Sequence, residues 1–127
     1  MKTTKNIYDL HEANKTGLSN LLFYKDELIV MQRRIEEVAK KNNSKEVLAS
    51  IEHFQNQLII QKEQLDILTH DIGEAEALLQ KAVHKLPTAI DHQKFPDQAA
   101  LSSRIETYEK LFKELRSELA HFFSKWM

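Results

Sequence analysis

Apolar residues recur at alternating spacings of four and three through the middle of the chain, and this repeat constrains the fold more than any other feature. Eleven of its twelve positions are apolar and only Gln61 is polar: Val47, Ile51, Phe54, Leu58, Gln61, Leu65, Leu68, Ile72, Ala75, Leu79, Ala82 and Leu86. An average spacing of about 3.5 residues keeps one stripe of an α-helix against a partner helix. The repeat therefore predicts a long amphipathic helix rather than a strand.

Two further segments carry the same repeat. The C-terminal stripe is apolar throughout and rich in aromatic residues: Leu101, Ile105, Tyr108, Phe112, Leu115, Leu119, Phe122 and Trp126. The N-terminal stripe includes two weak positions, Asn14 and Gly17: Ile7, Leu10, Asn14, Gly17, Leu21, Tyr24, Leu28, Met31, Ile35 and Val38. We interpret Gly17 as a close approach between helices or a kink.

Additional apolar residues flank all three stripes: Leu18, Leu22, Ile29, Leu48, Val83, Leu111 and Phe123. An apolar face wider than two positions per heptad indicates more than one neighbouring helix. This width favours a helical bundle over a two-stranded coiled coil.

Short polar segments and two prolines separate the stripes. The connection at residues 41–44 is so short that the first two helices must pack antiparallel, and Asn43 with Glu46 predicts a capping box. Pro87 ends the second helix, and Asp97 is the expected N-cap of the third. We predict one all-α domain over residues 1–127, an up-down-up bundle of three long antiparallel amphipathic helices with coiled-coil-like heptad packing. The helices are expected at about 9–41, 44–86 and 97–126, with ends uncertain by about three residues.

Helix length predicts how the three helices align along the bundle. At about 1.5 Å per residue, they would be about 50, 64 and 45 Å long. If the third helix starts level with Leu86, Trp126 ends near the level of residue 57. Only two helices would then cover the hairpin tip, leaving five apolar residues partly exposed: Ile35, Val38, Val47, Leu48 and Ile51. Because an exposed apolar surface favours a partner, we expect a homodimer through the tips or the edges beside the third helix.

Composition argues against several classes of function. Eighteen Lys and Arg residues accompany nineteen Asp and Glu residues, for a net charge of −1. Both signs are interleaved, so we expect neither a nucleic-acid nor a membrane partner. The absence of cysteine excludes disulfides and thiolate metal sites. With no secretory signal and no membrane-spanning apolar run, we expect a cytoplasmic protein.

The chain has six histidines, which raises the question of a metal site. By the heptad register four of them face away from the stripes: His53, His70, His84 and His121. His11 flanks its stripe, and His92 lies in the loop before the third helix.

Two groupings of these histidines resemble ligand sets only in part. Glu118 and His121 have the E-x-x-H spacing of di-iron bundles, but such sites need a second motif and an inward-facing histidine. A loop cluster could form from His84, Asp91, His92 and Asp97, although nothing in the sequence specifies its geometry. We therefore expect no metal, no cofactor and no catalytic residue.

The polar stripe residue Gln61 is expected to lie opposite Tyr24. A buried hydrogen bond between this amide and the phenol would set the register of the helices at some cost in stability. A ligand-binding role for the pair is the alternative.

Segments of the first two helices resemble a group of small bacterial helical-bundle proteins with no assigned activity. The resemblance rests on residues 23–28 (FYKDEL) and 52–57 (EHFQNQ), followed by residues 59–61 (IIQ). It covers roughly these two helices, implies no activity and carries over no site residue.

The sequence as a whole predicts no enzymatic activity and no specific biochemical function. We expect a structural or protein-protein interaction module that acts through its helical faces and self-association. The alternative is a metal- or small-ligand-binding helical bundle assembled by dimerisation.

Overall fold

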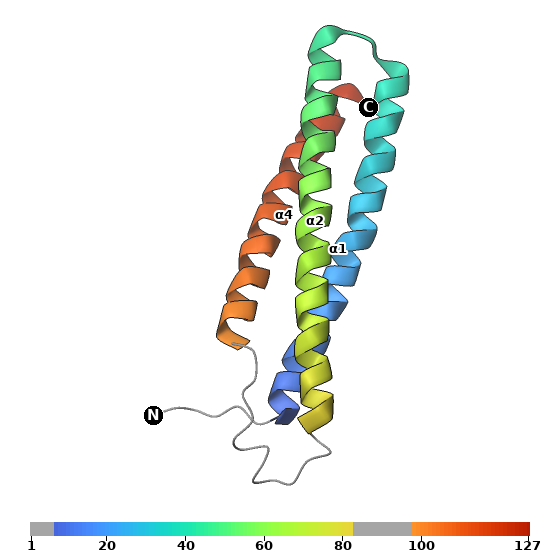
Figure 1. Cartoon of the computed structure of the whole chain (residues 1–127). Coiled ribbons are helices and arrows are strands. Elements are labelled where there is room, and N and C mark those ends of the chain that lie inside the picture. Colours follow the sequence, from blue (N-terminus) through green and yellow to red (C-terminus); the bar gives the residue numbers. More distant parts are fainter. Residues whose placement is uncertain (1–6, 83–97) are drawn as a thin grey trace.

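Three α-helices make up the residues that the computed structural model describes, 7–82 and 98–127. They are α1 (Ile7–Lys41), α2 (Lys45–Ala82) and α4 (Gln98–Trp126), and they pack lengthwise into one bundle (Figure 1). α1 and α2 run antiparallel, and α4 runs parallel to α1. The predicted all-α fold class is confirmed. The predicted Asp97 cap and the loop cluster with His84, Asp91 and His92 lie outside the described residues.

The repeat of four and three residues forms the core of this bundle. Every described position of the three stripes is buried, except that Ile7, Ile105 and Trp126 are partly buried. Complete burial of a Leu, Ile or Phe side chain contributes about 1.5–3 kcal/mol relative to exposure. The three stripes are therefore the main source of the bundle's stability.

Ser44 caps the start of α2. The backbone N–H of Val47 donates to Ser44 Oγ at 3.3 Å, and the backbone N–H of Leu48 donates to the Ser44 carbonyl oxygen at 3.0 Å. The predicted capping box of Asn43 and Glu46 is wrong, because the helix starts at Lys45 and the third residue after the cap is Val47.

α4 lies further toward the hairpin tip than helix length predicted. Arg104, six residues after Gln98, lies 2.7 Å from Asp71, so α4 begins short of the end of α2 at Ala82. Its end reaches the connection between α1 and α2, where Asn42 Nδ2 donates to the carbonyl oxygen of Trp126 at 3.5 Å. Figure 1 shows the C-terminus beside this connection, while the opposite ends of α1 and α2 extend past the start of α4.

The predicted exposure of the tip is therefore wrong for four of its five residues. Ile35, Val38 and Val47 are 0% exposed and Ile51 is 5% exposed, whereas Leu48 is 44% exposed. Fifteen residues separate Ala82 from Gln98, and a chain of that length can span up to about 50 Å. The end of α2 consequently does not determine where α4 begins, and α4 can shift to where its aromatic side chains pack.

Gly17 marks a close approach of all three helices, which is one of the two interpretations of this position. A Cβ atom on Gly17 would lie 3.3 Å from Cδ1 of Ile105 on α4 and 3.4 Å from Cδ1 of Ile72 on α2. Its backbone has no positive φ. The missing side chain therefore provides room for neighbouring isoleucines.

Candidate functional site

A groove runs between α1 and α2 on the side of the bundle away from α4. Leu28 and Leu58 form its floor, while Ile29 and Ile59 stand beside it with 45% and 57% of their surface exposed. The groove has a volume of about 410 Å³ and is lined by Lys25, Leu28, Ile29, Gln32, Arg33, Glu36, Leu58, Ile59 and Lys62. We call it the α1–α2 groove.

The heptad repeat predicts only part of this surface. Ile29 is among the flanking apolar residues that the repeat singles out, whereas Ile59 is missed because it lies outside the stripe. The available signal was the run Leu58-Ile59-Ile60. Three consecutive residues on a helix are spread around its circumference, so they cannot all face one core.

Four charged side chains surround the groove: Lys25, Arg33, Lys62 and Glu36. Lys62 Nζ lies 3.0 Å from Asp66 Oδ2 on the same helix, and Glu36 accepts a hydrogen bond from Gln32 Nε2 at 3.2 Å. Lys25 and Arg33 have no ion-pair partner within 4.0 Å in residues 7–82 and 98–127. The rim of the groove is therefore net positive.

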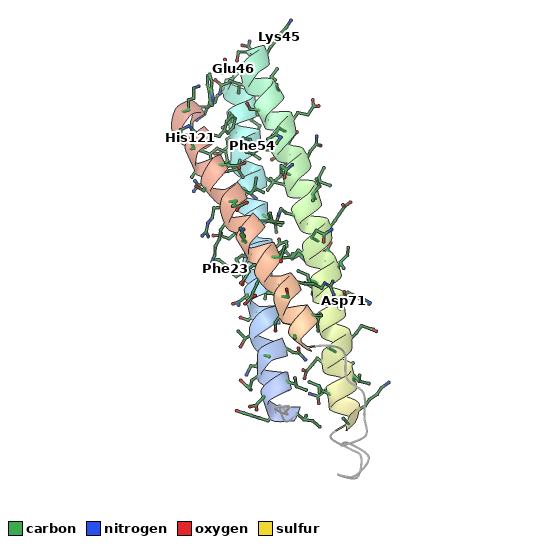
Figure 2. All side chains as sticks on the ribbon, turned by 90° about the vertical axis from the view of Figure 1, so that its left-hand side faces the viewer. Phe23, Lys45, Glu46, Phe54, Asp71 and His121 are labelled. Atoms are coloured by element: carbon green, nitrogen blue, oxygen red, sulfur yellow. The ribbon has the colours of Figure 1, made fainter. Side chains whose placement is uncertain are left out.

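Ion pairs bridge the two interfaces that involve α4. Arg116 lies 3.0 Å from Glu27 on α1, and Arg104 lies 2.7 Å from Asp71 on α2 (Figure 2 labels Asp71). The lining of the α1–α2 groove includes a lysine from each helix, Lys25 and Lys62. Like charges repel each other, so these two lysines do not join α1 to α2 at this level.

A polar cluster joins α1 to α2 near their other ends. Glu76 accepts three hydrogen bonds: from His11 Nδ1 at 2.6 Å, from Gln80 Nε2 at 2.8 Å and from Asn14 Nδ2 at 3.3 Å. The heptad repeat places His11 on a flank, and its partner was missed because Glu76 is 65 residues away. The buried stripe residue Asn14 thereby obtains a partner for its amide nitrogen.

The environment of Glu76 favours its ionised form. Burial raises the pKa of the carboxyl, but hydrogen bonds from Gln80, His11 and Asn14, together with the charge of His11, outweigh burial and lower the pKa below its ordinary value. This cluster therefore combines one carboxylate and one imidazole with two amides, which suits a structural ion pair between helices.

The E-x-x-H motif does not form a ligand set. His121 is exposed on the outer side of α4 (Figure 2), as the register predicted, and His53 and His70 are exposed as well. Within the described ranges 7–82 and 98–127, no three His, Cys, Asp or Glu side chains converge in a way that could hold a metal ion.

The predicted hydrogen bond between Tyr24 and Gln61 is wrong. Tyr24 instead donates its hydroxyl proton to Glu109 Oε2 on α4 at 2.9 Å. Burial, followed by the contact with Glu109, raises the pKa of Tyr24. Gln61 is 6% exposed, and its Oε1 has no hydrogen-bond partner in the described part of the chain. Since α4 packs beside α1, Tyr24 is oriented toward α4 rather than toward Gln61.

Tyr108 is a second buried phenol in this layer. Its ring centroid lies 6.0 Å from that of Tyr24, and its hydroxyl has no hydrogen-bond partner among the described residues. Burial strongly raises the pKa of Tyr108. A neutral phenol at this depth offers neither a charge nor an open pocket for chemistry.

Comparison with family models, with curated proteins and with solved structures yields no match to this chain. The resemblance to small bacterial helical-bundle proteins stays a prediction. None of the described helices is long and apolar enough to cross a membrane.

Proposed function

We propose that this chain is a protein-interaction module whose α1–α2 groove binds an amphipathic helix with acidic residues beside its apolar stripe. The observation that carries the proposal is an open apolar groove between the antiparallel helices α1 and α2, with Ile29 and Ile59 exposed beside it. Amphipathic helices bind such grooves through apolar residues spaced three and four apart. A bound helix would complete a four-helix bundle.

The charges around the groove favour an acidic partner. Lys25 and Arg33 have no ion-pair partner among the described residues, and Lys25 shares the groove with Lys62. Acidic side chains on an incoming helix would relieve the repulsion between these lysines and add charge-assisted hydrogen bonds. Complementary charge of this kind also speeds association and selects partners.

A second copy of this chain suits the groove less well. A two-fold axis through the middle of the groove would bring Lys25 and Lys62 of both copies together. Juxtaposed like charges at an interface cost several kcal/mol. The proposed occupant is therefore a helix from another protein.

Binding of a designed peptide tests the proposal. The probe is a fluorescently labelled helix of about 21 residues, with leucine at the a and d heptad positions and glutamate at e and g. The control peptide carries lysine in place of glutamate. Fluorescence anisotropy should show binding of the acidic peptide with a Kd at least about tenfold lower than that of the basic one.

Two isoleucines on α2 provide matched variants. Ile59→Glu in the groove should abolish binding, while Ile67→Glu, which is 48% exposed on another face, should leave it unchanged. The double variant Lys25→Glu with Lys62→Glu should reverse the preference between the two peptides. Equal affinity for both peptides, or equal losses in Ile59→Glu and Ile67→Glu, would show that the groove is not the binding site.

We propose that the module has no enzymatic activity of its own, since its partly buried hydrogen bonds, such as Tyr24 with Glu109 and His11 with Glu76, are contacts between helices. We also propose that it acts in the cytoplasm, because a chain without cysteine suits a reducing compartment.

A further inference from the structure

A second apolar surface lies over α2 and α4, on a different side of the bundle from the α1–α2 groove. Ile60 and Ile67 of α2 are 47% and 48% exposed, and Leu111 of α4 is 49% exposed. On α2, Ile67 lies four residues before Asp71, and Ile60 lies seven residues before Ile67. On α4, Leu111 lies seven residues after Arg104. Residues at these spacings share one side of a helix, so the three apolar residues lie on the side of the bundle where Asp71 pairs with Arg104.

The three apolar residues also lie at one level of the bundle. α2 and α4 are antiparallel, with Arg104 beside Asp71 and the rings of Phe54 and Phe122 5.2 Å apart. Moving seven residues along each helix from the ion pair therefore places Leu111 level with Gln64, between Ile60 and Ile67. These three half-exposed apolar residues are the centre of a surface that we call the α2–α4 face.

Charged residues continue this face in both directions at heptad spacing. On α2 the row runs His53, Ile60, Ile67, Glu74, and on α4 it runs Arg104, Leu111, Glu118. Each row is basic at one end, apolar in the middle and acidic at the other end. A row of this kind is complementary to a reversed copy of itself.

We propose that this chain forms a homodimer in which two α2–α4 faces pack about a two-fold axis perpendicular to the helices, close to Leu111. Each helix then runs antiparallel to its own copy. Leu111 meets the partner's Leu111, and Ile60 meets the partner's Ile67. Arg104 approaches the partner's Glu118, and His53 approaches the partner's Glu74.

One axis can satisfy both rows only if their midpoints are level. The midpoint of the α2 row lies between Ile60 and Ile67, and the midpoint of the α4 row is Leu111, which lies level with Gln64. The structure meets this condition, and a self-complementary patch is what a two-fold interface requires. Arg104 can serve both Asp71 and the partner's Glu118, because a guanidinium has five N–H donors.

The face is also large enough for a stable dimer. A helix of 29 residues is about 43 Å long. Two adjacent helices about 10 Å wide then offer on the order of 800 Å² per copy, which is the ordinary size of a specific interface. This inference does not depend on the proposed peptide-binding groove, because the α1–α2 groove stays open in the dimer.

Light scattering coupled to size exclusion, together with sedimentation equilibrium, tests the dimer. The wild-type chain should have about twice the monomer mass of 14.9 kDa at micromolar concentration. Ile67→Glu should raise the dissociation constant at least about 100-fold, because the two-fold axis buries two added carboxylates. Ile59→Glu is the matched control and should stay dimeric, and circular dichroism should show both variants to be helical.

Cysteine cross-linking tests the axis, because the natural chain has no cysteine. Under mild oxidation Leu111→Cys should form a disulfide-linked dimer, since a residue near a two-fold axis meets its own copy. Ile59→Cys should not. A monomeric wild-type chain, or a dimer that Ile59→Glu and Ile67→Glu disrupt equally, would overturn the proposed face. A dimer in which Leu111→Cys fails to cross-link would overturn the proposed axis.

Discussion

Replacement of Ile35 by alanine tests whether α4 covers the hairpin tip. Ile35 is 0% exposed, and the change removes three carbon atoms from its side chain. At about 0.8 kcal/mol for each buried carbon the transfer cost is about 2.4 kcal/mol. The cavity left behind brings the expected loss to about 3–4 kcal/mol.

Ile29→Ala is the matched control on the same helix. Ile29 is 45% exposed, so about half of its side chain is already in water and its removal should cost about 1 kcal/mol. Both variants exchange the same residue types within α1, so differences in helix propensity cancel. A chain of 127 residues is expected to be stable by about 6–19 kcal/mol, and both variants should therefore fold.

Urea unfolding followed by circular dichroism at one protein concentration measures the two losses. With unchanged m values, the shift in midpoint gives the change in free energy of unfolding. We expect Ile35→Ala to lose at least about 2 kcal/mol more than Ile29→Ala. If the two losses agree within about 0.5 kcal/mol, Ile35 is not enclosed and α4 does not pack on the tip as described.

Two further predictions concern buried polar groups. Folding lowers the pKa of Glu76, so its ionised form stabilises the bundle at neutral pH. This contribution to the free energy of unfolding is lost as the pH falls below about 4.3, the ordinary pKa of glutamate. Urea midpoints between about pH 7 and pH 3 should therefore fall more in the wild-type chain than in Glu76→Gln, and parallel profiles would contradict the role of the cluster. Tyr24→Phe should cost about 1 kcal/mol because it loses the 2.9 Å bond to Glu109, whereas Tyr108→Phe should be neutral or stabilising because it removes a buried hydroxyl without a partner among the described residues. Equal losses of stability in these two variants would contradict that contrast.

Local periodicity predicted the features that depend on one helix at a time. The described stripe positions face the core as expected, and the exposed positions of His53, His70 and His121 follow from the same register. The interpretation of Gly17 as a close approach between helices is also confirmed, since Ile105 and Ile72 occupy the space beside it. Such features follow from the 3.6-residue turn, which a neighbouring helix does not change.

Contacts between helices were predicted less well. Tyr24 was expected to reach Gln61 because the alignment considered only α1 and α2, and it bonds to Glu109 of α4 instead. The pair of His11 and Glu76 was missed for a similar reason, because flanking residues meet only when the offset between two helices is known. A shift of one turn moves a helix by about 5.4 Å, which is enough to exchange one partner for another.

The amino-acid sequence by itself determined that the chain forms three amphipathic helices and which residue of each faces inward, because burial of apolar stripes at helical spacing is a local property. Only the tertiary structure decided that α4 covers the tip and that Ile59 borders an open groove. Ion pairs join α4 to α1 and to α2, whereas at the level of the groove α1 and α2 carry Lys25 and Lys62. That arrangement depends on the relative positions of helices joined by a fifteen-residue segment, and side-chain packing between helices sets those positions.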